Sequence, residues 1–98
     1  MPQQASGPGY GATKDQLLKR LSRVEGQIRG VGRMVEDDRY CIDVLTQISA
    51  AQAALDKVAL GLLDDHAHHC VIGAKTAEER DEKTGELMAA VGRLMRRG

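Results

Sequence analysis

The sequence predicts an all-α protein, and two observations support this fold class. The 98 residues include neither Trp nor Phe and only two Tyr, so aliphatic side chains and Met must build the core. Strands of a sandwich or barrel favour β-branched and aromatic residues, whereas packed helices do without aromatic ones. Two long segments also repeat apolar residues at alternating steps of four and three, the period of an amphipathic helix. Because so small a domain buries little surface alone, several copies are expected to associate.

The first twelve residues differ in composition from the rest of the chain. They hold both prolines and lack apolar periodicity, which predicts a flexible N-terminal tail over residues 1–12. Residues 13–98 are then a single helical domain.

The first helix is predicted from Lys14 to about Asp37 and Asp38. Either aspartate could cap the following helix by accepting hydrogen bonds from its free N–H groups. The apolar stripe of this first helix consists of Leu17, Leu21, Val24, Ile28, Val31 and Val35.

The second helix is predicted from about Cys41 to Gly73, with Gly73 in the left-handed conformation after its last turn. It carries a coiled-coil-like seam made of Cys41, Leu45, Ile48, Gln52, Leu55, Ala59, Leu62 and His66. Thr76 and Glu79 form a capping box that starts a third helix. Because its apolar face is shorter, the third helix is expected to pack as a cover over the other two.

Charge, apolar runs and cysteine content bear on the protein's partners, its cellular location and the state of its cysteines. The 14 basic and 14 acidic residues cancel, so total charge neither favours nor excludes a nucleic-acid partner. A secretory h-region and a membrane-spanning apolar run are both missing from the sequence, which predicts a cytoplasmic protein. In a reducing compartment the two cysteines are expected to bind metal or react as thiols rather than form a disulfide.

Residues 64–70 hold all three histidines and one of the two cysteines. His66 and Cys70 are four residues apart, which places them on one face of a helix. The natural third ligand is Cys41, but a helix of about 25 residues would separate it from His66 by roughly 37 Å. An antiparallel pairing of this helix with its copy in a second chain would bring Cys41 against the other chain's ligand pair. The spacing therefore predicts a dimer with two equal sites.

Two thiolates and one imidazole are a soft ligand set, which favours trigonal Cu(I), whereas Zn²⁺ would call for a fourth ligand. The alternative is that Cys41 is a small buried apolar residue and Cys70 an ordinary thiol at a helix end. His68 and His69 point to other faces and are expected to be solvated or to lie beside the site without binding metal.

A basic stripe is predicted on the first helix, opposite its apolar stripe, and it consists of Lys19, Arg20, Arg23, Arg29 and Arg33. Glu25 is the one acid in this segment, so the stripe suits contacts to DNA phosphates. The alternative is an ordinary solvated helix face. Neither zinc-finger spacing nor a helix-turn-helix pattern is present.

The segment RLSRVEGQIRGVGRMVEDDRYCIDVLTQISAAQAAL, followed by HAHHC, resembles the copper-sensitive operon repressor family. The resemblance covers about Lys14 to Arg96. It implies that Cys41, His66 and Cys70 bind Cu(I) and that Arg20, within the basic first helix, contacts operator DNA. Lys57 stands where members often carry a second DNA-contacting arginine.

The resemblance also implies a tetramer built as two dimers, each dimer an antiparallel four-helix bundle. Tyr40 and Glu86 correspond to residues near the ligands, with Glu86 expected to hydrogen-bond the His66 ring. Related branches sense nickel, cobalt, formaldehyde or persulfide. A persulfide sensor would lack the ligand histidine, and a nickel sensor would carry more histidines, one of them near the N-terminus.

These observations predict a Cu(I)-responsive repressor that leaves its operator when copper binds, without catalysis. Two alternatives stay open. One is a thiol-based redox or persulfide sensor that links Cys41 and Cys70 between subunits and does not need His66. The other is a copper-buffering protein without a DNA role.

Overall fold

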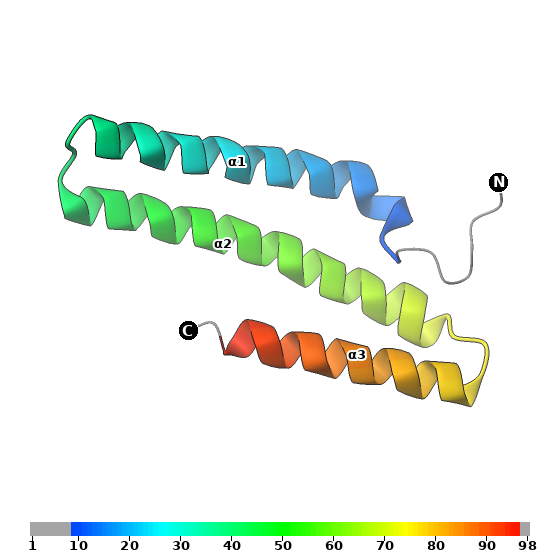
Figure 1. The fold of residues 1–98 in the computed structure, drawn as a ribbon. Coiled ribbons are helices and arrows are strands. Elements are labelled where there is room, and N and C mark those ends of the chain that lie inside the picture. The colour runs from blue at the N-terminus through cyan, green and yellow to red at the C-terminus, as the bar shows by residue number, and fades with distance from the viewer. Residues whose placement is uncertain (1–8, 97–98) are drawn as a thin grey trace. The chain divides into compact units, whose positions relative to one another are not determined.

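The computed structural model describes residues 9–96, and within that range every regular element is helical, as the sequence predicted. A short 3-10 turn, η1 (Gly11–Thr13), precedes two long helices, α1 (Lys14–Glu36) and α2 (Cys41–Asp65). A π-helical segment, η2 (His66–Ile72), follows α2 directly, and α3 (Ala77–Met95) ends the described chain (Figure 1). Of the predicted tail, residues 1–8 lie outside the described part, Gly9 and Tyr10 lead into η1, and Gly11 and Ala12 belong to it.

The chain divides into two compact units. The first, called here the hairpin unit, comprises Lys14–Ala59, that is, α1 and most of α2. The second, called here the C-terminal unit, begins at Leu60 and includes η2 and α3, together with the N-terminal segment up to Thr13. The helix α2 therefore runs from one unit into the other.

In the hairpin unit, α1 and the first part of α2 run antiparallel, side by side (Figure 1). The buried apolar residues are Leu17 and Val24 on α1 and Ala51 and Val58 on α2. An apolar groove is lined by Val24 and Ile28 of α1 and by Ala51 and Leu55 of α2. These few small side chains form a thin core, which leaves much apolar surface exposed.

The seam predicted on α2 belongs to this exposed surface. Leu45 is 56% exposed and Leu55 is 45% exposed, whereas Ala51 and Val58, seven residues apart on a different face, are buried. The hairpin therefore uses one face of α2 for its own core and leaves the seam open.

The turn between α1 and α2 corrects the prediction that Asp37 or Asp38 caps α2. Asp38 has φ 56°, a left-handed conformation that only it adopts among the described non-glycine residues. Its N–H donates to the Val35 carbonyl at 3.1 Å, and the Arg39 N–H donates to the Met34 carbonyl at 3.0 Å. This bond pair is a Schellman motif, so Asp38 terminates α1 where Gly or Asn is usual.

A second correction concerns the end of α2, because the α-helix stops at Asp65 and not near Gly73. From His66 to Ile72 the backbone is π-helical, with hydrogen bonds that span five residues. Gly73 has φ −80°, so it is not left-handed. Glycine is needed there for another reason: a Cβ at Gly73 would lie 2.8 Å from the His69 carbonyl oxygen.

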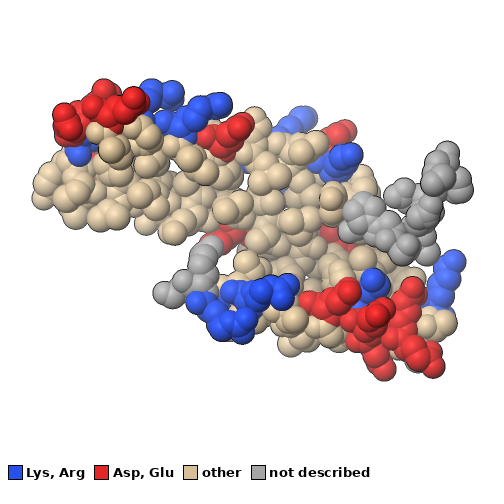
Figure 2. Space-filling view, viewed as in Figure 1, with Lys and Arg blue, Asp and Glu red and all other residues tan. Residues whose placement is uncertain are grey.

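Thr76 caps α3 as predicted, but Glu79 reaches back to the N–H of Lys75, one residue before the cap, and not to that of Thr76. The Glu79 N–H donates to the Thr76 hydroxyl at 3.1 Å, and the Glu79 carboxylate accepts from the Lys75 N–H at 2.8 Å. Acidic side chains gather over the first half of α3 and basic ones over its end, as the helix dipole favours (Figure 2). The helix packs against η2. Over the described range, the structure contains no helix long and apolar enough to span a membrane.

Candidate metal centre and basic surface

His66 is the first residue of η2, and its ring is held against α3. Its Nε2 lies 2.8 Å from the carbonyl oxygen of Lys83. A carbonyl oxygen can only accept a hydrogen bond, so Nε2 carries the proton in this contact. In the neutral ring, Nδ1 then keeps the lone pair that a metal ion needs.

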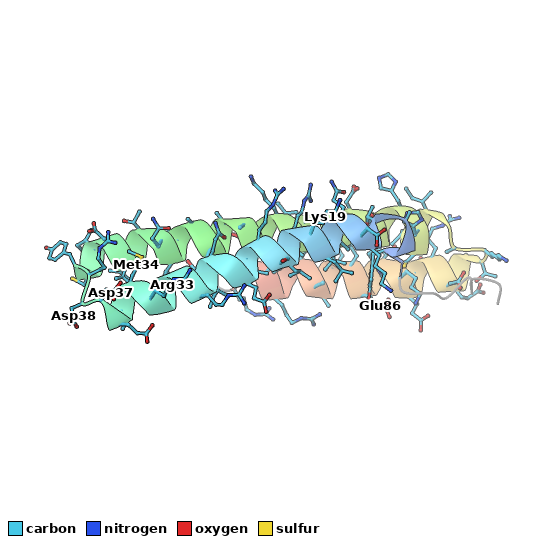
Figure 3. All side chains as sticks on the ribbon, turned by 90° about the horizontal axis from the view of Figure 1, so that it is seen from above. Lys19, Arg33, Met34, Asp37, Asp38 and Glu86 are labelled. Carbon is cyan, nitrogen blue, oxygen red and sulfur yellow. The ribbon has the colours of Figure 1, made fainter. Side chains whose placement is uncertain are left out.

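Glu86 lies beside the same ring, one turn after Lys83 on α3; Figure 3 labels its position on this helix. Its Oε1 is 3.9 Å from Nε2 of His66 and 3.6 Å from Nζ of Lys83. The distance to His66 is too long for a hydrogen bond, which the Lys83 carbonyl makes instead. The hydrogen bond expected between Glu86 and the ring is therefore not formed, and the backbone of α3 orients the ring.

Cys70 is half-buried in η2, four residues after His66. Part of its cover comes from the N-terminal segment, since a Cβ at Gly9 would lie 2.8 Å from the Cys70 sulfur. Both residues belong to the C-terminal unit. His66 and Cys70 are thus carried by the one segment of the described chain that forms a π-helix, and π-helical turns occur often at functional sites.

Cys41 is the first residue of α2 and is exposed. It lines a shallow hollow together with Val35, Val44 and Leu45. Tyr40, which precedes it, is 68% exposed, and its carbonyl accepts the Val44 N–H in the first turn of the helix. Cys41 is therefore the first residue of the 25-residue helix α2, and His66 directly follows its last residue, Asp65. Within residues 9–96 of one chain, the structure brings no three potential ligands together.

The remaining two histidines are exposed. His68 pairs with Asp64 at 3.3 Å across one helical turn, and both side chains are more than half exposed. Such a surface pair contributes little to stability. Solvated positions for His68 and His69 agree with the sequence-based expectation.

The basic stripe lies along α1, where Figure 2 shows basic side chains interspersed with acidic ones. Lys19 lies near the start of α1 and Arg33 near its end, close to Asp37 and Asp38 (Figure 3). Arg20 is half-buried, whereas Lys19, Arg23, Arg29 and Arg33 are exposed, as is Lys57 on α2. These side chains can reach a phosphate backbone.

Three residues of this region were not found from the sequence. Lys83 contributes a backbone carbonyl, a group that every residue has and that leaves no sequence signal. Thr13 and Asp65 form a hydrogen bond across 52 residues, a pairing that periodicity cannot reveal. A weak signal existed for Asp65, because it belongs to the acidic pair that ends an apolar run just before His66.

An all-α chain with thiol and imidazole groups at its helix ends and a basic first helix has the features of a metal-responsive regulator. The chain belongs to the family of metal-sensitive transcriptional repressors, whose pattern its residues 13–93 match. The resemblance inferred from the sequence is confirmed by this match.

Named relatives are similar over most of the chain. The copper-sensing transcriptional repressor RicR of Mycobacterium tuberculosis (strain ATCC 25618 / H37Rv) is 56% identical over 90 residues, covering 90% of this chain and 94% of the relative. The copper-sensing transcriptional repressor CsoR of Bacillus subtilis (strain 168) is 56% identical over 75 residues, covering 76% and 74%. The crystal structure of the copper-sensing repressor CsoR with Cu(I) from Geobacillus thermodenitrificans NG80-2 has a TM-score of 0.79 and 43% identity, covering 97% and 93%.

Proposed function

We propose that this chain is a Cu(I)-responsive transcriptional repressor of the bacterial cytoplasm. Without metal it binds operator DNA, and it leaves the DNA when Cys41, His66 and Cys70 together hold Cu(I). The names of its relatives support the assignment, since two are copper-sensing transcriptional repressors and one similar structure is a CsoR with Cu(I).

The donor atoms suit this metal. Cys41 and Cys70 are free thiols, and the hydrogen bond from His66 Nε2 to the Lys83 carbonyl leaves Nδ1 as the third donor. Two thiolates and an imidazole are the soft, three-membered set that Cu(I) accepts. Bound Cu(I) would supply strong bonds that join these three side chains.

The observation that carries the proposal is the exposed seam of α2 with ligands at both its ends. Leu45 and Leu55 leave about half of their surfaces in solvent, at 56% and 45% exposed, which is costly in an isolated chain. An antiparallel pairing of two such seams would bury them. It would also set Cys41 of each chain beside the partner's His66 and Cys70, giving two sites related by a two-fold axis.

The hollow beside Cys41 fits this arrangement. Val35, Val44 and Leu45 line it together with the charged Asp38 and Arg39, and the incoming end of a second chain would cover the thiolate there. Dimers of this kind, joined in pairs, would form the tetramer that the family resemblance implies.

The basic residues supply the DNA contact. Lys19, Arg20, Arg23, Arg29 and Arg33 on α1, with Lys57 on α2, would bind phosphates, and the symmetry of the assembly would multiply them into an extended positive surface. Lys57 lies outside the seam, so pairing leaves it accessible. Binding of copper then weakens binding of the operator, and binding of the operator weakens binding of copper, by the same coupling free energy.

A mixing experiment tests the shared site. We expect the Cys41→Ala chain alone, and the His66→Ala, Cys70→Ala chain alone, to lose more than about 100-fold in Cu(I) affinity, since even outer partners of a metal site are worth 10–100-fold. Heterodimers of the two should recover about one intact site each. Cu(I) affinity is measured anaerobically by competition with a Cu(I) chelator.

His68→Ala is the matched control, because this exposed histidine lies on the same segment and should leave Cu(I) affinity unchanged. Mixtures that recover no copper binding would rule out a site shared between chains. Fluorescence anisotropy with operator DNA then separates the alternatives: a copper buffer would not bind the operator, and a thiol-based redox sensor would respond to oxidant with His66→Ala as with the parent protein.

The same titration tests the basic surface. Arg20→Ala should weaken operator binding and lower the slope of affinity against salt by about one unit for each phosphate that is no longer neutralised. If the operator affinity and its dependence on salt are unchanged, the basic stripe is an ordinary solvated helix face.

A further inference from the structure

The N-terminal segment Gly9–Thr13 is folded back on the C-terminal unit by specific contacts. The Thr13 N–H donates to the Tyr10 carbonyl at 3.0 Å, closing a turn. The Thr13 hydroxyl lies 2.5 Å from Oδ2 of Asp65 and 3.3 Å from the Tyr10 carbonyl. A hydroxyl has one proton, and the short distance assigns it to the carboxylate, as a charge-assisted hydrogen bond.

Asp65 depends on this bond because it is 7% exposed, the one buried charged residue in the described part of the chain. A buried carboxylate without a hydrogen-bond partner is strongly unfavourable, so the Thr13 contact stabilises the position of the N-terminal segment. Asp65 is also the last residue of α2 and directly precedes His66. The segment is therefore fastened beside the first ligand of the pair.

Gly9, at the other end of the segment, covers the second ligand. Its φ of 91° lies in the region that favours glycine, and a Cβ there would come within 2.8 Å of the Cys70 sulfur. No other residue would allow the backbone to approach the thiol so closely. The turn that Thr13 anchors thus ends in direct contact with Cys70.

We propose that Gly9–Thr13 is a strap over the half-buried Cys70 thiol. The Thr13–Asp65 hydrogen bond fastens the strap, and the strap slows the approach of a reagent or a metal ion to the sulfur until it opens. The functional meaning of the strap rests on the proposed role of Cys70 as a Cu(I) ligand, but the cover itself does not.

The test measures thiol reactivity in the metal-free, fully reduced protein, without DNA. Alkylation by iodoacetamide is followed at each cysteine by mass spectrometry of the peptides, and the rate at Cys70 is compared with its rate in the same protein after denaturation. Thr13→Val keeps the shape of the side chain and removes its donor. Since a hydrogen bond to a charged group is worth about 1.5–3 kcal/mol, we expect Cys70 to react about 10-fold faster or more.

Thr46→Val is the matched control, because the Thr46 hydroxyl donates only to the Ile42 carbonyl within the exposed face of α2. It should leave the Cys70 rate unchanged. A second pair of variants does not touch the hydrogen bond: Gly9→Ala should also speed the reaction by displacing the strap, whereas Gly11→Ala, with open space around its Cβ, should not.

Hydrogen exchange at the Thr13 amide, which is bonded to Tyr10, checks that the strap has opened, with faster exchange expected in Thr13→Val. An unchanged Cys70 rate in both Thr13→Val and Gly9→Ala would overturn the strap and leave the proposed function intact. Faster alkylation in a protein that neither binds Cu(I) nor responds to it would support the strap and overturn the proposed function.

Discussion

The hairpin unit and the C-terminal unit are stabilised by different kinds of contact. The hairpin unit consists of regular α-helices around four small buried apolar residues, and large apolar side chains such as Leu45 remain exposed. The C-terminal unit contains a π-helical segment, a buried carboxylate and hydrogen bonds between distant residues, among them His66 with Lys83 and Thr13 with Asp65.

This difference indicates a division of labour. The hydrophobic interaction between exposed apolar surfaces is not directional, so such surfaces suit association with other copies of the chain. Polar contacts are directional and break when their geometry changes, which suits a segment that must respond to a ligand. Under the proposed function, the hairpin unit would be the part that assembles, and the C-terminal unit would be the part that responds to copper.

The largest effect is expected when the seam of the hairpin unit is charged. Leu45→Lys places an ammonium group in the surface that the proposed dimer buries, and an unpaired buried charge costs several kcal/mol. The dimer dissociation constant should rise by more than about 100-fold, measured by analytical ultracentrifugation over a concentration series. Ala50→Lys, also exposed on α2 but outside the seam, is the control and should stay assembled. If the two variants have the same dimer dissociation constant, the interface lies elsewhere on the chain.

The two units also differ in how far the sequence predicted them. Apolar periodicity predicted the helices α1 and α2 and the seam, because one helical period describes the whole hairpin unit. The cap at Thr76 was predicted since it belongs to a local motif with fixed spacing. In contrast, the change from α- to π-helix at His66 has no periodic signal, and η2 was predicted as a continuation of α2.

The candidate site follows the same pattern. Residue types and spacing indicated Cys41, His66 and Cys70 as ligands, and this assignment remains a prediction. The partner of the His66 ring could not be predicted, because it is the backbone carbonyl of Lys83 on another helix. Aspartate and glycine at the two turns were assigned to the wrong roles, since Asp38 and Gly73 fit several turn types and tertiary contacts decide between them.

A smaller effect is expected at the contact between the ligand end and α3. In Glu86→Ala the Lys83 carbonyl still orients the His66 ring, so Cu(I) affinity should fall by less than about 10-fold. The drop in operator affinity on adding copper should shrink by about 5-fold, the lower end of typical couplings. Both are measured by anisotropy and chelator competition, with Glu82→Ala, exposed one turn earlier on α3, as control. A parent-like drop in Glu86→Ala would show that coupling does not pass through this carboxylate.

The smallest effects are expected at one turn in each unit. Asp38 has the left-handed conformation in which glycine is usual, whereas Gly73 is a glycine without that conformation. At Gly73 a Cβ would meet the His69 carbonyl oxygen at 2.8 Å, and a backbone atom cannot move aside cheaply. Gly73→Ala should therefore destabilise the protein by about 1–3 kcal/mol even though φ there is −80°. Gly85→Ala, in the open middle of α3, should instead stabilise it by about 1 kcal/mol.

Asp38→Gly should change stability in the opposite direction to Gly73→Ala. Asp38 holds φ 56° at the end of α1, a conformation that costs a side-chain-bearing residue about 1 kcal/mol and glycine little. The Schellman hydrogen bonds use backbone groups alone, so they survive the substitution. The free energy of unfolding should rise by about 0.5–1 kcal/mol in denaturant titrations at fixed protein concentration. Asp37 has no such backbone strain, so the control Asp37→Gly should destabilise the protein slightly. If Asp37→Gly instead stabilises the protein as much as Asp38→Gly does, the stabilisation comes from removing negative charge at the helix end and not from φ.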